Sequence, residues 1–435
     1  MIKKELLKQI IRDFHLQPVF DVKPRDVQVP LGTGKIITLM GVRRCGKTSM
    51  LLDTVNRLAR TLDKTLMVFI NFEDERLDLA ANELDLIIQA YRELYPGKDL
   101  ARCHLFFDEI QNVDGWERFV RRVYDTVTKN IVLTGSNSRL LGSEIATSLR
   151  GRTLGMEVFP LSFSEFLRFQ DLKADVHSSR DLALIRNAQT DFLRHGGFPE
   201  TLSIDHKHRT MLLQEYFNVL LYRDIVERYK VQNVVALKYF LKRLVSSTTK
   251  QLSIHKIYTE LKSANIRVGK NTLYDFLDYA ETVYLAQVLY RYDQSLVTRE
   301  LGEKKVYAID TGLCDAVEYR FSHDMGKALE NAVFLELRRT GAELFFYRGQ
   351  NLECDFLLVD RGRVKEAVQV CFDLSDPETR RREAKGLVAA CSRFGLSKGT
   401  IITGDDSDQW SMDQIQVDAV PFYRRFSQPD HIDAF

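Results

Sequence analysis

Residues 41–48 read Gly-Val-Arg-Arg-Cys-Gly-Lys-Thr, which is a complete G-x-x-x-x-G-K-T phosphate-loop motif. A short apolar run at 35–40 precedes it and the helical spacing of 49–59 follows it, the context that this loop requires. Glycines at both ends let backbone N–H groups turn toward a phosphate, and the helix adds its positive dipole end. The predicted ATP contacts are Gly41, Val42, Arg43, Arg44, Cys45, Gly46, Lys47, Thr48 and Ser49.

Within this loop, Lys47 is the predicted catalytic cation that bridges the β- and γ-phosphates, and the Thr48 hydroxyl is a predicted Mg²⁺ ligand. A second stretch, HLFFDE at 104–109, is an apolar strand that ends in Asp108 and Glu109. Carboxyl ends of parallel strands meet at one sheet edge, so both acids should lie beside the loop. We expect Asp108 to orient Mg²⁺ and Glu109 to act as the general base toward water. The alternative is a strand that ends in two solvated acids.

Three further candidates have structural alternatives. Asn137, with Ser136 as second choice, follows the next predicted strand and would sense the γ-phosphate, although both also suit a capped turn. Arg150 and Arg152 are predicted to stabilise transition-state charge across a subunit boundary, which requires an oligomer. Surface salt bridges are the alternative for these arginines, as for the two within the phosphate loop.

The composition of the chain restricts its number of domains, its partners and its location. The 435 residues suggest about three domains, and the net charge of +2 leaves no global basic field for nucleic acid. The six cysteines form no C-x-x-C pair, which favours reduced thiols and a cytoplasmic protein. The sequence lacks any run of 18 apolar residues, so no membrane association is expected.

The order of predicted elements indicates an α/β fold. Alternating strands and helices from about 35 to 160 predict a mostly parallel sheet between helices. A helical stretch follows, then two helices and a strand, then a final α/β segment. The predicted domains are a P-loop ATPase domain at 1–165, a helical region at 166–247, a winged-helix segment at 248–300 and a C-terminal domain at 301–435.

The order of motifs along the chain resembles a family of bacterial and archaeal AAA+-like P-loop ATPases. These motifs are GVRRCGKT, INFED (70–74), FFDEIQN (106–112), LTGSNS (133–138), LRGRT (149–153), FPLSFSEF (159–166), GGFPE (196–200), YRDIVERY (222–229) and KVYAIDTGL (305–313). The resemblance covers nearly the whole chain. It implies a winged-helix segment and a C-terminal domain with a restriction-endonuclease-like fold and no assigned function.

The winged-helix candidate comprises helices at 254–263 and about 271–280, followed by a wing strand at 283–292. Such folds place the second helix in the DNA major groove, where Lys270, Asn271, Tyr274 and Asp275 would point outward. That face is only modestly basic even with Arg267 nearby. A winged helix that serves packing or protein contact is the alternative.

The C-terminal segment matches the endonuclease-like pattern only in part. Glu330, Asp355 and Gln369 fit its metal-binding positions and form a possible second metal site. Cys371, however, stands where the pattern has lysine, and a neutral thiol suits a hard-metal hydrolytic site poorly. The expectation is a domain that does not cut DNA.

Two hypotheses follow for the whole chain. The first is a Mg²⁺-dependent, ATP-hydrolysing switch that acts on or near DNA through its winged-helix and C-terminal segments. The second is a signalling or scaffold ATPase whose C-terminal domains bind a protein partner. Near-neutral charge favours the second, and the two nucleic-acid-associated folds favour the first.

Overall fold

The computed structural model describes residues 2–136, 149, 151–172, 175, 178–317, 324–350 and 352–428. These residues form two compact units, Met1–Val158 and Phe159–Phe435. Each unit has its own sheet and its own buried apolar core.

The first unit is built on a parallel sheet of five strands in the order β2-β3-β4-β1-β5. Apolar side chains fill most of its strands because helices cover both faces. The strands are β1 (Ile36–Met40), β2 (Met67–Asn71), β3 (His104–Asp108), β4 (Ile131–Gly135) and β5 (Thr153–Glu157). The prediction of a parallel α/β sheet is confirmed, and β5 is an edge strand that the sequence patterns did not indicate.

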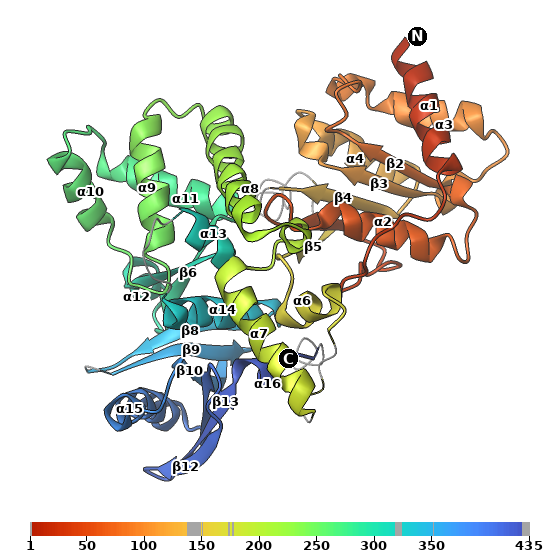
Figure 1. Ribbon diagram of the computed structural model, residues 1–435. Helices are drawn as coiled ribbons and strands as arrows, with labels where there is room; N and C mark the ends of the chain where they lie inside the picture. The colour runs from red at the N-terminus through yellow and green to blue at the C-terminus, as the bar shows by residue number, and fades with distance from the viewer. Residues whose placement is uncertain are drawn as a thin grey trace. The chain divides into compact units, whose positions relative to one another are not determined.

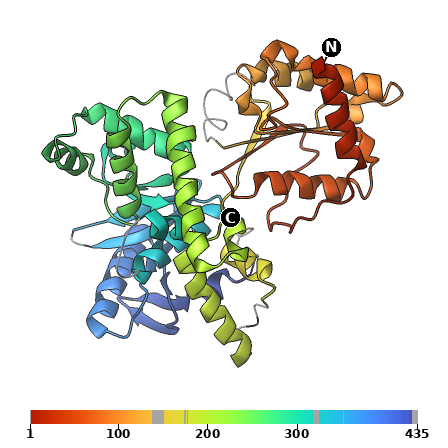
Figure 2. The same ribbon diagram turned by 45° about the horizontal axis from the view of Figure 1, so that its top comes forward.

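Right-handed connections determine which face each helix covers. The connection from β1 to β2 passes two intervening strands in one direction along the sheet, and the connections from β2 to β3 and from β3 to β4 run in the opposite direction. For this reason α2 lies on one face of the sheet, and α3 and α4 lie on the other (Figures 1 and 2). The helices of this unit are α1 (Ile2–Leu16), α2 (Lys47–Leu58), α3 (Asp85–Leu94) and α4 (Trp116–Thr126). All parallel strands end at the same edge, where α2 begins.

The second unit begins with helices, as its spacing predicts. They are α6 (Phe163–Phe169), α7 (Ser179–His195), α8 (His206–Val219) with its π-helical continuation Leu220–Glu227, α9 (Val234–Ser246), α10 (Ile254–Ser263) and α11 (Lys270–Thr282). The remaining helices are α12 (Leu296–Leu301), α13 (Thr311–Val317), α14 (Met325–Arg339), α15 (Pro377–Phe394) and α16 (Phe422–Phe426). Figure 1 shows α14 and α15 on opposite sides of the large sheet of this unit.

That sheet is mixed and has eight strands in the order β12-β13-β11-β10-β9-β8-β6-β7. Its strands are β6 (Ala286–Arg291), β7 (Lys304–Ala308), β8 (Glu343–Arg348), β9 (Glu353–Asp360), β10 (Arg363–Val370), β11 (Lys398–Thr403), β12 (Asp408–Met412) and β13 (Ile415–Pro421). The strand expected as a wing is β6, which pairs with both β7 and β8. The helix-turn-helix segment therefore continues directly into the C-terminal sheet.

The GGFPE and KVYAIDTGL motifs meet at a close contact. Gly196 has φ 74°, and a Cβ atom there would lie 2.1 Å from Oδ1 of Asp310. The Asp310 carboxylate accepts hydrogen bonds from the N–H groups of Gly197 (2.7 Å) and Leu313 (2.9 Å). Burial nevertheless raises the pKa of Asp310 to about 6, so this contact depends on a carboxylate that its surroundings penalise.

We expect Gly196→Ala to lower the free energy of unfolding by more than about 2 kcal/mol, because it combines a backbone penalty with a clash. Gly395 is a control for a positive φ without the contact: its φ is 71° with ψ 29°, in the αL region, whereas Gly196 has ψ −167°, and an added Cβ on Gly395 meets nothing within 4 Å. Gly395→Ala should cost only about 1 kcal/mol, the backbone term alone. Urea denaturation of both variants measures the difference, and equal losses would contradict the close contact at Gly196.

Candidate active site

The phosphate loop has a shape that glycine makes possible. Gly46 has φ 102°, in the left-handed region, and it directly precedes α2. A Cβ atom on Gly41 would lie 2.0 Å from the carbonyl oxygen of Val158. The loop thus packs against the chain that leaves β5, and the positive end of the α2 dipole lies at the loop.

Lys47 lies at the centre of this loop and is only 4% exposed. Its ammonium donates hydrogen bonds to the carbonyl oxygens of Gly41 (3.0 Å) and Val42 (3.1 Å). It lies 3.6 Å from Oε1 of Glu109. The loop therefore holds a buried cation within reach of the acid at the end of β3.

Asp108 is the next part of the site. Its Oδ2 accepts a hydrogen bond from the Thr48 hydroxyl at 2.8 Å, and its Oδ1 accepts one from the Thr134 hydroxyl at 2.5 Å. Burial raises the pKa of the Asp108 carboxyl above its ordinary value, whereas both hydroxyl groups act to lower it. The structure brings Thr48 and Asp108 together as expected for two oxygen ligands of one divalent ion.

Glu109 is held by its backbone and by a neighbour that the sequence analysis did not single out. Its φ of 52° is left-handed, and its N–H donates to the Thr134 hydroxyl at 2.9 Å. The side-chain amide of Gln111 donates a hydrogen bond to Oε2 of Glu109. Thr134 and Gln111 thus position the two acids. Thr134 belongs to the LTGSNS motif, where it is a polar residue in an apolar strand, and Gln111 belongs to the FFDEIQN motif.

The other residues of the phosphate loop are less central. Nη1 of Arg43 forms a 2.7 Å ion pair with Glu73, which belongs to the INFED motif. Arg44 is exposed and has φ 68°, and Ser49 is exposed in the first turn of α2.

Cys45 is fully buried, and burial raises the pKa of its thiol. Its carbonyl oxygen accepts a hydrogen bond from Nη1 of Arg25 at 2.9 Å. Arg25 lies outside every motif of the sequence, so only the folded structure reveals that it supports the loop.

Two of the predicted catalytic residues, the γ-phosphate sensor Asn137 and the arginine Arg150, lie outside the described residues. Ser136 is described, and its buried hydroxyl has no hydrogen-bond partner within the part of the chain that the structure describes. Arg152 forms an ion pair with Asp125 through Nε (3.0 Å) and Nη2 (3.2 Å). The roles of Asn137, Arg150 and Arg152 in catalysis remain predictions.

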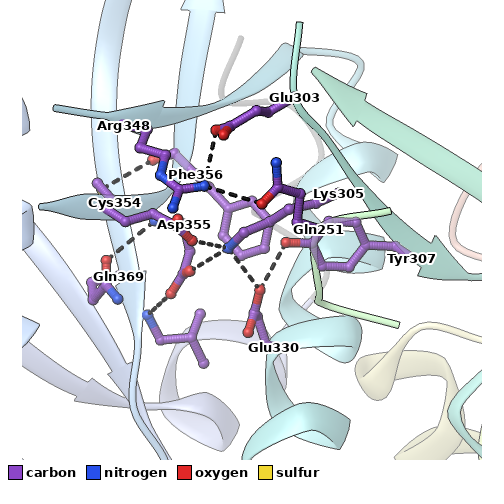
Figure 3. Close-up of polar contacts among 12 residues, drawn as sticks. Gln251, Glu303, Lys305, Tyr307, Glu330, Arg348, Cys354, Asp355, Phe356 and Gln369 are labelled. Atoms are coloured by element: carbon purple, nitrogen blue, oxygen red, sulfur yellow. Dashed lines mark hydrogen bonds and ion pairs between the residues drawn. The ribbon is translucent and has the colours of Figure 1, made fainter. Parts of the chain in front are cut away.

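In the second unit, Glu330 of α14 and Asp355 of β9 come together as predicted, but around a lysine that the sequence analysis did not select. Figure 3 shows the Lys305 side chain of β7 pointing between them. Its Nζ lies 2.9 Å from Oδ1 of Asp355, 3.5 Å from Oε1 of Glu330 and 2.6 Å from Oε1 of Glu353. We call Lys305, Glu330, Glu353 and Asp355 the lysine–carboxylate cluster.

The sequence analysis expected Gln369 to be a metal ligand together with Glu330 and Asp355, but its side chain bonds to the Asp355 backbone and to Glu383 instead. Its Oε1 accepts from the N–H of Asp355 at 3.1 Å, and its amide group donates to Glu383 at 2.7 Å. Among the described residues, no group of three His, Cys, Asp or Glu side chains is arranged to hold a metal ion. The possible second metal site thus contains an ammonium, and the predicted amide ligand is bonded elsewhere.

Cys371 follows β10 directly and is partly buried. Its thiol donates a hydrogen bond to the carbonyl oxygen of Asp373 at 3.2 Å. Burial raises the pKa of Cys371 to about 11, so the thiol is neutral at physiological pH. It can supply neither charge to a phosphate nor a base to water.

The predicted DNA-reading helix is α11, and its exposed residues include Lys270, Asn271, Tyr274, Asp275 and Asp278. Lys270 lies over the ring of Tyr258, 5.3 Å from its centroid. Two acids and one lysine on this face give it no excess of positive charge. Arg267, in the preceding turn, is exposed as well.

Comparisons with known proteins show the family to which the chain belongs. A family model described as an AAA domain matches residues 33–167, and one described as a domain of unknown function matches residues 186–324. The uncharacterized protein MJ1544 of Methanocaldococcus jannaschii is 36% identical over 436 residues, which cover 97% of this chain and 95% of the relative. The chain belongs to this family of AAA+ P-loop ATPases. Another family member, an uncharacterized protein of Haemophilus influenzae, is 27% identical and covers 94% of this chain and 96% of its own.

Solved structures are more distant. The Orc1 protein of Aeropyrum pernix, solved in complex with DNA, has a TM-score of 0.33 and 12% identity over 73% of this chain and 91% of its own. AMPPCP-bound DnaA of Aquifex aeolicus has a TM-score of 0.23 and 15% identity over 64% of this chain and 86% of its own. The TM-scores and identities of these two structures are too low to bear on function. In the described part of the chain, every helix is too short or too polar to span a bilayer.

Proposed function

We propose that this AAA+ family member is a Mg²⁺-dependent ATPase whose site is the edge formed by the phosphate loop, Asp108 and Glu109. The observation that carries the proposal is the convergence of Lys47, the Thr48–Asp108 pair and Glu109 at one edge of the parallel sheet. The residues fit the substrate and its metal, because a buried ammonium, a helix N-terminus and two hard oxygen ligands lie together.

Each residue has a chemical task in this proposal. Lys47 would release the carbonyl oxygens of Gly41 and Val42 and bind the β- and γ-phosphates. Thr48 and Asp108 would hold Mg²⁺, which neutralises charge on the phosphates when it is bound. Glu109 would accept a proton from the attacking water once Lys47 has turned to the phosphates. Arg150 and Arg152 are proposed to act from a neighbouring subunit, for which Arg152 would have to leave Asp125.

The hydrogen bond from Gln111 should keep the Glu109 carboxylate oriented toward water, so Gln111 is a positioning residue in this proposal. Losing one hydrogen bond to a charged group costs about 1.5–3 kcal/mol, so Gln111→Ala should lower kcat roughly tenfold or more with KM for ATP nearly unchanged. Steady-state phosphate release measures both constants. Gln89→Ala, on an exposed position of α3, is the control and should leave both unchanged. A rise in KM without a fall in kcat would contradict the role of Gln111.

We further propose that ATP turnover makes the protein a switch that acts on or near DNA, with a C-terminal domain that does not cut it. The family resemblance motivates this target. A second candidate, a protein partner bound by the C-terminal unit, is favoured by Asp275 and Asp278 on the exposed face of α11. Binding of labelled duplex DNA at several salt concentrations, with and without ATP, distinguishes them. Affinity that falls steeply with salt supports the DNA target, and absence of binding at low salt supports the protein partner.

A further inference from the structure

The lysine–carboxylate cluster joins three elements that are distant in sequence. Lys305 comes from the edge strand β7, Glu330 from α14, and Glu353 and Asp355 from the start of β9. Figure 3 shows the ammonium between the Asp355 and Glu330 side chains, with the Tyr307 hydroxyl directed at the same Glu330 oxygen as the ammonium. The Tyr307 hydroxyl donates to Oε1 of Glu330 at 2.8 Å.

The ammonium of Lys305 is fully used. It has three N–H donors, and three carboxylate oxygens lie between 2.6 and 3.5 Å from Nζ. Lys305 and Asp355 are each 6% exposed, so water contributes little to the solvation of their charges. A charge buried in this way is tolerated only because it is paired.

The acids outnumber the cation. One ammonium faces three carboxyl groups, those of Glu330, Glu353 and Asp355. Asp355 has its second oxygen bound as well, since Oδ2 accepts from the N–H of Val370 at 3.1 Å. Four of the six carboxylate oxygens of the cluster are therefore engaged, and three of these four face the ammonium.

Carboxylate oxygens are the ligands that a hard divalent cation prefers, although these three acids, arranged around the ammonium among the described residues, form no metal site as they stand. The difference here is that the cation is an ammonium attached to the chain, which cannot dissociate or exchange. We propose that Lys305 is a built-in counter-ion that occupies the place of a divalent metal ion between Glu330, Glu353 and Asp355. This inference deepens the proposed non-cleaving role of the C-terminal domain, and it rests on that part of the proposed function.

Two consequences follow from the tethered cation. It excludes metal-assisted water activation at Glu330 and Asp355, because the space between them already holds positive charge. It also ties β7, β9 and α14 together without any ion from solution. Removing the charge but keeping the length of the side chain should unmask a site for divalent cations.

The test is Mn²⁺ binding to the full chain without nucleotide, followed by electron paramagnetic resonance and by thermal denaturation. Lys305→Met should bind Mn²⁺ at least about tenfold more tightly than the unaltered protein, with a melting temperature that rises with Mn²⁺ concentration. Adding Asp355→Asn to that variant should remove the gain. Lys304→Met is the matched control, because Lys304 is the neighbouring lysine of β7 and lies over the ring of Tyr290. It should behave as the unaltered protein does.

Folding of the variants is part of the readout. If Lys305→Met fails to fold in chelator but folds with Mn²⁺, the proposal is supported, since the metal then replaces the ammonium. If neither Lys305→Met nor Lys305→Ala binds Mn²⁺ in any folded or refolding sample, the proposal is wrong. It is equally wrong if the unaltered protein binds Mn²⁺ without nucleotide and Asp355→Asn abolishes that binding. None of these outcomes depends on ATP hydrolysis, so failure here is distinct from failure of the proposed ATPase.

Discussion

Lys47→Ala is expected to weaken ATP binding by about 100-fold or more and to remove hydrolysis. The ammonium is the only cation that the described loop buries at its centre, and the phosphates would lose its charge-assisted hydrogen bonds. Two such bonds at about 1.5–3 kcal/mol each account for a loss of this size. Titration with a fluorescent ATP analogue measures the binding, and a phosphate-release assay measures the hydrolysis.

Lys64→Ala is a suitable control for the loss of one lysine in the same unit. Its ammonium donates to the carbonyl oxygen of Gln17 at 2.7 Å, in a contact that involves neither the loop nor the acids. This variant should bind and hydrolyse ATP as the unaltered protein does. Unchanged ATP affinity in Lys47→Ala would show that the loop does not bind phosphates through this residue.

Glu109→Gln is expected to bind Mg²⁺-ATP normally and to hydrolyse it about 10²–10⁴ times more slowly, the range that general-base catalysis contributes. An amide oxygen is a far weaker base than a carboxylate, yet it has nearly the same size and can still face Gln111 and Lys47. Single-turnover hydrolysis separates chemistry from binding.

An exposed acid, Glu75, provides the control for Glu109, and Glu75→Gln should leave turnover unchanged. Hydrolysis by Glu109→Gln at the rate of the unaltered protein would assign the base to another group. Slow hydrolysis together with weakened ATP binding would instead indicate that Glu109 supports the position of Lys47, from which it lies 3.6 Å.

Local sequence predicted which residues lie together at the phosphate loop, because the motifs that hold them have a spacing that reflects local geometry. GVRRCGKT specifies a turn before a helix, and HLFFDE specifies acids at a strand end, so the meeting of Thr48 with Asp108 followed from the parallel sheet. Thr134 was missed because its hydroxyl acts across neighbouring strands. A polar residue in a buried strand was the available signal.

The C-terminal cluster could not be predicted in the same way. Lys305 and Asp355 are separated by 50 positions and lie on strands that are not adjacent in the sheet. The sequence pattern places a lysine at Cys371, directly after β10, whereas the ammonium reaches the acids from β7. The pairing of β6 with β7 and β8 could not be predicted from the sequence either, because a strand that follows two helices is typical of a wing until its partner strands are known.

The most direct test of the central claim is phosphate release from ATP by the full chain, measured with and without Mg²⁺. The account predicts steady turnover that requires Mg²⁺, is lost in Asp108→Asn because one of the two metal ligands is removed, and is lost in Lys47→Ala. Turnover that is absent from the folded, unaltered protein, or that persists unchanged in both variants, would contradict the assignment of this sheet edge as an ATPase site.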